Sequence, residues 1–148
     1  MKRTGLFLVA LVCMIMQSAT SFAGDDKFVP IEQLPTEVWF FVQENFPKTT
    51  ISFATKDFEL KGEKYEVRLT NGTKIKFDKK GHWDKVYCKS HNVPTPLIPT
   101  AIYKFVRAYY PTATIVKIDK KRYGYKVELS NDIELKFNKS GLLISIDD

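Results

Sequence analysis

The sequence predicts an α+β fold, built as a tandem duplication of one small module that consists of a helix followed by a four-stranded antiparallel sheet. Short motifs recur along the chain, first 64 and then 60 residues apart: Leu34-Pro35-Thr36 returns as Ile98-Pro99-Thr100, and Tyr65 returns as Tyr125. In each copy, helical periodicity comes first and strand-like alternation follows it. We therefore expect a first module at residues 24–88, a proline-rich connector at residues 89–97 and a second module at residues 98–148.

The N-terminus has the pattern of a secretory signal peptide. Lys2 and Arg3 precede a short apolar run, and Ser21-Phe22-Ala23 places small residues where a signal peptidase cuts. A membrane anchor needs about 20 apolar residues, and this run is shorter. Lipid attachment at Cys13 is the minor alternative, because Cys13 lies inside the apolar run. We predict cleavage after Ala23, a periplasmic or secreted protein, and no membrane span in the rest of the chain.

A helix is predicted at the start of each module. Pro35 and Pro99 suit the first turn of a helix. Phe46-Pro47 and Tyr110-Pro111 end the two helices, because the residue before a proline is pushed toward extended geometry. In the second copy, apolar residues follow the i, i+3, i+4, i+7 pattern of a helix face; they are Ile102, Phe105, Val106 and Tyr109.

Turn residues separate the expected strands. Asn71-Gly72 is a strong signal for a two-residue hairpin between strands at residues 65–70 and 73–78, and Asn131-Asp132 is the weaker equivalent in the second copy. Gly81 and Gly141 stand where tight turns need positive φ. Each helix should therefore lead into an antiparallel meander.

Alternation along these strands separates two faces of each sheet. The core side should carry Tyr65, Val67, Leu69, Ile75 and Phe77, repeated as Tyr125, Val127, Leu129, Leu135 and Phe137. The other side of the first sheet should carry Glu66, Arg68, Lys74, Lys76, Trp83, Lys85 and Tyr87.

The candidate binding residues lie on that second side. Trp, Tyr and Arg anchor protein interfaces, and the candidates are Arg68, Lys76, Trp83 and Tyr87. The alternative is that Trp83 and Tyr87 pack between the two modules.

The net charge of +6 is unevenly distributed. Residues 24–88 carry equal numbers of basic and acidic groups, so the surplus of the mature chain lies in its second half. A secondary basic patch accounts for most of it: Lys117, Lys120, Lys121, Arg122 and Lys126. We interpret this patch as a solvated hairpin rather than a nucleic-acid site, because an exported protein rarely meets nucleic acid.

Catalytic and metal-binding patterns are weak. Cys88 and His91 could be a nucleophile and a base, yet no third group is implied. His82, His91 and Cys88 fall short of the four closely spaced ligands of a structural zinc site. We therefore predict no enzyme activity, no metal and no cofactor.

The repeated pattern of Leu-Pro, amphipathic helix, aromatic-Pro, Tyr-x-Val-x-Leu, Asn-Gly, Lys-x-Phe-Asp and Gly resembles the PepSY-like family of beta-lactamase-inhibitor-like proteins, which Bacteroides-type bacteria export. The resemblance implies two modules whose sheets line a shared concave surface, as in the beta-lactamase inhibitor protein. Asp132 departs from the turn glycine, and Leu142-Leu143 replaces His82-Trp83. The two halves should therefore not bind alike.

Three functions follow as hypotheses. The first is a non-catalytic binding protein, acting on another protein in the envelope or outside the cell, such as an inhibitor of an enzyme there. The second is a sensor of small molecules or cell-wall fragments, which needs a concave apolar pocket. The third and weakest is a hydrolase centred on Cys88.

Overall fold

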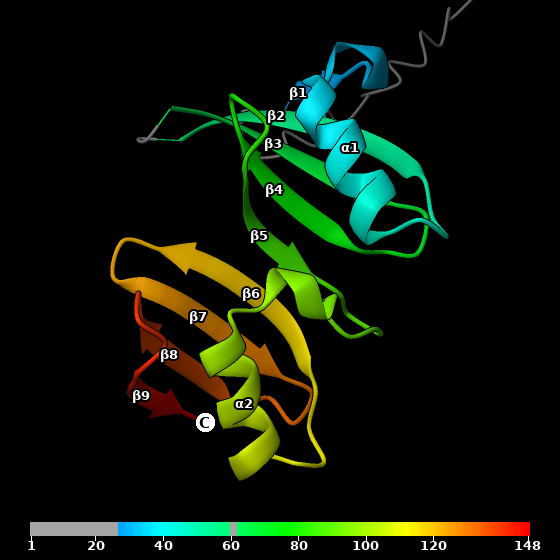
Figure 1. Cartoon of the computed structure of the whole chain (residues 1–148). Helices are drawn as coiled ribbons and strands as arrows, with labels where there is room; N and C mark the ends of the chain where they lie inside the picture. The colour runs from blue at the N-terminus through cyan, green and yellow to red at the C-terminus, as the bar shows by residue number, and fades with distance from the viewer. Residues whose placement is uncertain (1–26, 60–61) are drawn as a thin grey trace, which may run out of the picture.

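The computed structural model describes residues 27–59 and 62–148, so the predicted signal peptide and Cys13 lie outside the described residues. The described chain forms one antiparallel sheet of nine strands, whose order in space follows their order in the sequence, and two α-helices (Figure 1). The strands are β1 (Lys27–Val29), β2 (Ile51–Glu59), β3 (Gly62–Leu69), β4 (Lys74–Asp78), β5 (Trp83–Tyr87), β6 (Ile115–Lys121), β7 (Gly124–Leu129), β8 (Glu134–Asn138) and β9 (Leu143–Asp147). The helices are α1 (Thr36–Asn45) and α2 (Thr100–Tyr109), each preceded by a short 3-10 helix, at Ile31–Gln33 and Thr95–Leu97.

The predicted fold class, a duplicated module with its own four-stranded sheet, is wrong. β5 and β6 are neighbours in the same sheet, with Val86 opposite Ile118 and Tyr87 opposite Lys117. β1 adds one more strand by pairing with β2. Edge strands expose rows of unpaired backbone N–H and C=O groups, and the pairing of β5 with β6 satisfies one such row from each strand. The result is a sheet-dominated fold with a single continuous sheet.

The local turns follow the chemistry of their residues. The turn between β3 and β4 is one residue longer than the predicted two-residue hairpin: Thr70, Asn71 and Gly72 lie between Leu69 and Thr73, whose backbones are hydrogen-bonded at 2.9 Å, and Gly72 has a φ of +85°. The Asn71 side chain accepts a hydrogen bond from the backbone N–H of Thr73 at 3.0 Å. In the second half, Asp132 takes the same left-handed conformation with a φ of +69°, which an aspartate tolerates better than most residues.

Both α-helices cover the same face of the sheet (Figure 1). Phe41 of α1 meets Phe77 edge-on at 5.3 Å between ring centroids, and Phe105 of α2 meets Phe137 in the same way at 5.4 Å. The apolar core continues across the β5–β6 junction, where Val86 and Ile118 are fully buried. The opposite face of the sheet has no described helix over it, and we call it the helix-free face.

Candidate binding face

The helix-free face is covered by a lattice of cross-strand ion pairs. Alternation along each strand sends polar side chains to this face. Exposed ion pairs of this kind contribute at most about 1 kcal/mol each to stability. These pairs therefore add little to the stability of the fold. The pairs and their N–O distances are Lys74–Glu66 (3.5 Å), Lys117–Glu128 (3.5 Å), Lys126–Glu134 (3.0 Å) and Lys136–Asp147 (3.2 Å).

Aromatic rings interrupt this lattice, and two of them, Phe53 and Tyr87, lie near a cation. The guanidinium carbon of Arg68 is 6.0 Å from the centre of the Phe53 ring, and Lys117 Nζ is 5.9 Å from that of Tyr87. Phe28 of the edge strand β1 packs on Phe53, with 5.9 Å between ring centroids, and stays 79% exposed. Arg68 Nε is buried and has no hydrogen-bond partner among the described residues. An aromatic ring beside a cation with spare hydrogen-bonding capacity is a common anchor in protein interfaces.

Three of the four predicted binding residues lie on the helix-free face. Arg68 is opposite Lys74 in the β3–β4 pair, Lys76 is opposite Glu66, and Tyr87 is opposite Lys74 in the β4–β5 pair. These three residues lie on β3, β4 and β5, on the first-half side of the β5–β6 junction. Sequence reasoning missed Phe53, whose place on this face follows from its pairing with Arg68.

The predicted face of Trp83 is wrong. A bulge between Lys76 and Phe77 in the β4–β5 register places Trp83 opposite the core residue Phe77. An extra residue in a strand reverses the alternation of faces beyond it. Trp83 therefore packs on the helix side, 6.2 Å from the Phe41 ring between centroids, and joins the core. The spacing of Trp83 and Val86 in the sequence could have indicated this bulge, because two apolar residues three positions apart share a face only if the strand is bulged.

The secondary basic patch is divided by the structure. Lys117 and Lys126 are paired with carboxylates on the helix-free face. Lys120 instead lies over the Trp83 ring, with its Nζ 3.8 Å from the ring centre. Lys121 pairs with Asp119 at 3.1 Å, and Arg122 is exposed in the β6–β7 turn.

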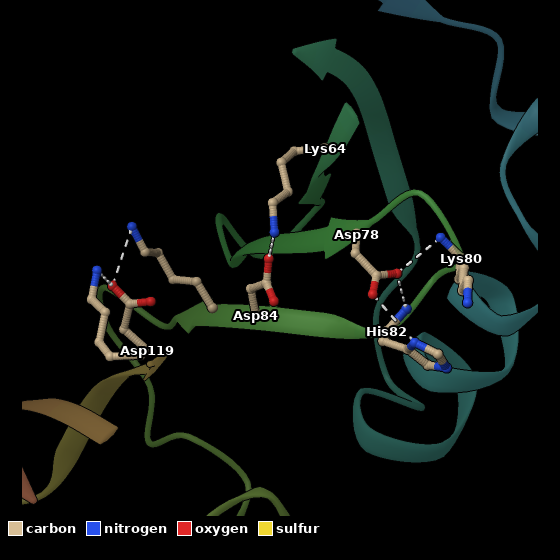
Figure 2. A network of polar contacts seen from close by, with 8 residues as sticks. Lys64, Asp78, Lys80, His82, Asp84 and Asp119 are labelled. Atoms are coloured by element: carbon tan, nitrogen blue, oxygen red, sulfur yellow. Dashed lines mark hydrogen bonds and ion pairs between the residues drawn. The ribbon is translucent and has the colours of Figure 1, made fainter. Parts of the chain in front are cut away.

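Part of this patch meets charged residues of the first half at the β5–β6 junction. Lys64 pairs with Asp84, and Asp119, only 5% exposed, lies between Lys121 and Lys85, the latter at 3.5 Å (Figure 2). These side chains line a cleft of about 230 Å³. We call this pocket the junction cleft. Its seven lining residues are Lys64, Lys76, Asp84, Lys85, Asp119, Lys120 and Lys121.

Asp78 shapes the turn beside this cleft. Its Oδ1 accepts hydrogen bonds from the backbone N–H groups of Lys80 at 2.9 Å and His82 at 3.0 Å (Figure 2). Burial by itself raises the pKa of Asp78, but these two bonds and the nearby His82 ring outweigh it and hold the pKa below its usual value. Asp78 is therefore an ionised structural residue that fixes the β4–β5 turn.

Cys88 has the surroundings of a structural thiol. It is fully buried, and Thr73 Oγ1 donates a weak hydrogen bond to its Sγ at 3.9 Å. Burial raises the pKa of the Cys88 thiol, although the Thr73 contact works in the opposite direction. A nucleophilic cysteine needs a lowered pKa and access to substrate, so this geometry does not favour the hydrolase hypothesis.

We expect Cys88 to resist alkylation by a maleimide at pH 7.5 until the protein unfolds. A thiol with a raised pKa in the folded state supports folding fully below the unfolded pKa of about 8.5, and this contribution is lost as the pH rises toward the folded pKa. The free energy of unfolding should therefore fall above about pH 8.5, and should fall less in Cys88→Ala. Rapid alkylation of the folded protein would contradict this account.

The described residues show neither a metal cluster nor a membrane-spanning helix. No group of three or more His, Cys, Asp or Glu side chains in this part of the chain could hold a metal ion. Neither described helix is long and apolar enough to cross a bilayer.

Comparison with known proteins identifies the family. A family model described as "Putative beta-lactamase-inhibitor-like, PepSY-like" matches residues 63–145, more than half of the chain. The chain belongs to this PepSY-like family. The family resemblance of the sequence is thereby confirmed. A comparison with curated proteins found no match.

Three solved structures resemble the chain over most of its length. A "putative calcium-regulated periplasmic protein" from Bacteroides thetaiotaomicron has 40% identity and a TM-score of 0.79, covering 84% of this chain and 98% of its own. Two structures from Bacteroides vulgatus, each described as a "putative periplasmic protein", also have TM-scores of 0.79. They have 39% and 30% identity and cover 85% and 83% of this chain and 99% of their own. Since all three are described as periplasmic, the predicted periplasmic or secreted location is confirmed.

Proposed function

We propose that this PepSY-like protein is a non-catalytic binding protein of the cell envelope, which holds a partner protein against its helix-free face. The observation that carries the proposal is the continuous sheet. Nine strands at about 4.8 Å spacing give a face roughly 40 Å wide with no described helix over it. A standard protein interface takes about 800 Å² from each partner, and a face of this width is large enough to supply it.

The chemistry of this face supports a protein partner. Phe53 and Tyr87 offer rings beside Arg68 and Lys117, and the Arg68 side chain, 37% exposed, can present its terminal N–H groups to a partner's carbonyl or carboxylate. Interfaces place such anchors near their centre and surround them with a polar rim. We expect the anchor region to be centred between Phe53 and Tyr87.

We further propose that the partner is an envelope or extracellular enzyme, which the bound protein inhibits. The family description compares its members with beta-lactamase inhibitors, and an extended sheet face can cover the mouth of an active site. The proposal names a class of partner and not a particular enzyme, because a shared fold does not by itself imply a shared target.

Affinity capture with matched variants tests the proposal. Tagged mature protein, Tyr87→Ala and Tyr109→Ala would each be incubated with envelope extract, and the captured proteins compared by quantitative mass spectrometry. Tyr109 is 70% exposed on α2, on the other side of the molecule, and serves as the control. A specific partner should be captured by the wild type and by Tyr109→Ala, and lost with Tyr87→Ala, since a hot-spot truncation costs about 2 kcal/mol or more.

The activity of the captured protein then tests inhibition. If it is an enzyme, its rate should fall when wild-type protein is added and should recover when Tyr87→Ala replaces it. Equal capture by all three forms, or loss with Tyr109→Ala alone, would overturn the proposed face.

A further inference from the structure

The junction cleft collects more positive charge than its carboxylates balance. Five lysines and two aspartates line it. Asp84 pairs with Lys64, and Asp119 is shared by Lys85 and Lys121. Without Lys76, which has an interaction of its own, the other four lysines and two aspartates still give a formal surplus of two positive charges, and the cleft lies between the two halves of the chain.

The strand geometry explains why the lysines converge. β5 and β6 pair only from Lys85–Asp119 to Tyr87–Lys117, whereas β6 continues beyond the junction in its pairing with β7 as far as Lys121. Beyond Lys85 the two strands no longer pair, and each remains held by its neighbour in its own half of the sheet. Side chains from both halves thus face one another across the gap.

Lys120 adds a fixed cation at the rim. Its Nζ is 3.8 Å from the centre of the Trp83 ring, and Trp83 in turn packs on Phe41 of α1. Burial lowers the pKa of Lys120, although Asp84 and Asp78 act in the opposite direction. An added negative charge in the cleft would offset the cost of keeping this partly desolvated lysine charged.

We propose that the junction cleft binds a small anion with two or more adjacent negative charges, of the phosphoryl class. Clefts lined by one sign of charge concentrate counter-ions, and lysine ammonium groups bind phosphate oxygens as point charges. A volume of about 230 Å³ has room for a molecule of several heavy atoms. The variants that test the cleft change Lys121 and Asp84, not the proposed anchors Phe53, Arg68 and Tyr87, so failure of the cleft is distinguishable from failure of the protein-binding face.

Calorimetric titration of the mature protein with pyrophosphate at about 0.1 M salt tests the site. Lys121→Gln should weaken binding about tenfold, because it removes one unit charge within a few ångströms of the anion. Asp84→Asn should strengthen binding severalfold, because it releases Lys64 from its partner. Lys104→Gln on α2 removes the same charge far from the cleft and should leave affinity within about twofold of the wild type, given screening over about 10 Å at 0.1 M salt.

The pattern across the three variants decides the outcome, with thermal unfolding confirming that each is folded. Equal weakening by Lys121→Gln and Lys104→Gln, no effect of Asp84→Asn, or no binding of pyrophosphate or vesicles would overturn the proposal. Vesicles containing phosphatidic acid, with phosphatidylcholine vesicles as the control, distinguish the source of the phosphoryl group. Binding of pyrophosphate alone assigns a soluble ligand, whereas binding to the acidic vesicles that Lys121→Gln weakens assigns a lipid headgroup.

Discussion

Gly124→Ala is expected to destabilise the protein by about 3–5 kcal/mol, because the new side chain would collide with backbone atoms. Gly124 has a φ of +149° at the start of β7. A Cβ there would lie 2.2 Å from the carbonyl oxygen of Phe137 and 2.4 Å from the carbonyl carbon of Asn138. Both atoms belong to β8, so relief requires a shift of one strand against the other.

Gly72→Ala is the matched control for this prediction. Gly72 also has positive φ, at +85°, but no atom lies within 4 Å of its hypothetical Cβ. Its substitution should cost about 1 kcal/mol, for the left-handed conformation alone. Denaturant unfolding of both variants measures the difference, and equal losses would show that contact with β8 has no role.

Trp83→Ala is expected to lower the free energy of unfolding by about 2–3 kcal/mol, somewhat less than a fully buried tryptophan would. The Trp83 ring packs on Phe41, and Lys120 Nζ lies over the Trp83 ring. The melting temperature should fall by roughly 3–5 °C for each kcal/mol lost. Tyr87→Ala, on the helix-free face, should lower it much less.

The effects of Trp83→Ala and Tyr87→Ala on partner binding should be the reverse of their effects on stability. Partner capture should survive Trp83→Ala at a temperature where the variant is folded, and should be lost with Tyr87→Ala. If Trp83→Ala abolished capture without any fall in melting temperature, the ring would have to face the partner, contrary to its packing on α1.

Much of the local structure could be predicted because local chemistry determines it. The Asn71-Gly72 turn and the helix ends before Pro47 and Pro111 depend on residues that are adjacent in sequence. The core positions Val67, Ile75 and Phe77 follow from alternation within a single hairpin. Each of these features requires only neighbouring residues to be known.

The overall sheet could not be predicted in the same way. The pairing of β5 with β6 joins strands that are separated by α2, and no turn residue marks it. The bulge beside Trp83 reverses one side chain without changing the composition of its strand. The junction cleft depends on both features, because Lys64 and Asp84 meet Lys121 and Asp119 only when the two halves share a sheet. Sequence reasoning therefore found Lys120 and Lys121 as part of a hairpin but not their neighbours.

Chemical footprinting of lysines tests the central claim, that the helix-free face is the binding surface. The reactivity of each lysine toward an acetylating reagent would be measured by mass spectrometry for the free protein and for its complex with the captured partner. The account predicts that Lys74, Lys117 and Lys136, which lie on the helix-free face, lose reactivity in the complex. Lys104 on α2 and Lys48 after α1 should be unchanged. Protection of Lys104 and Lys48 with no change at the three sheet lysines would contradict the account.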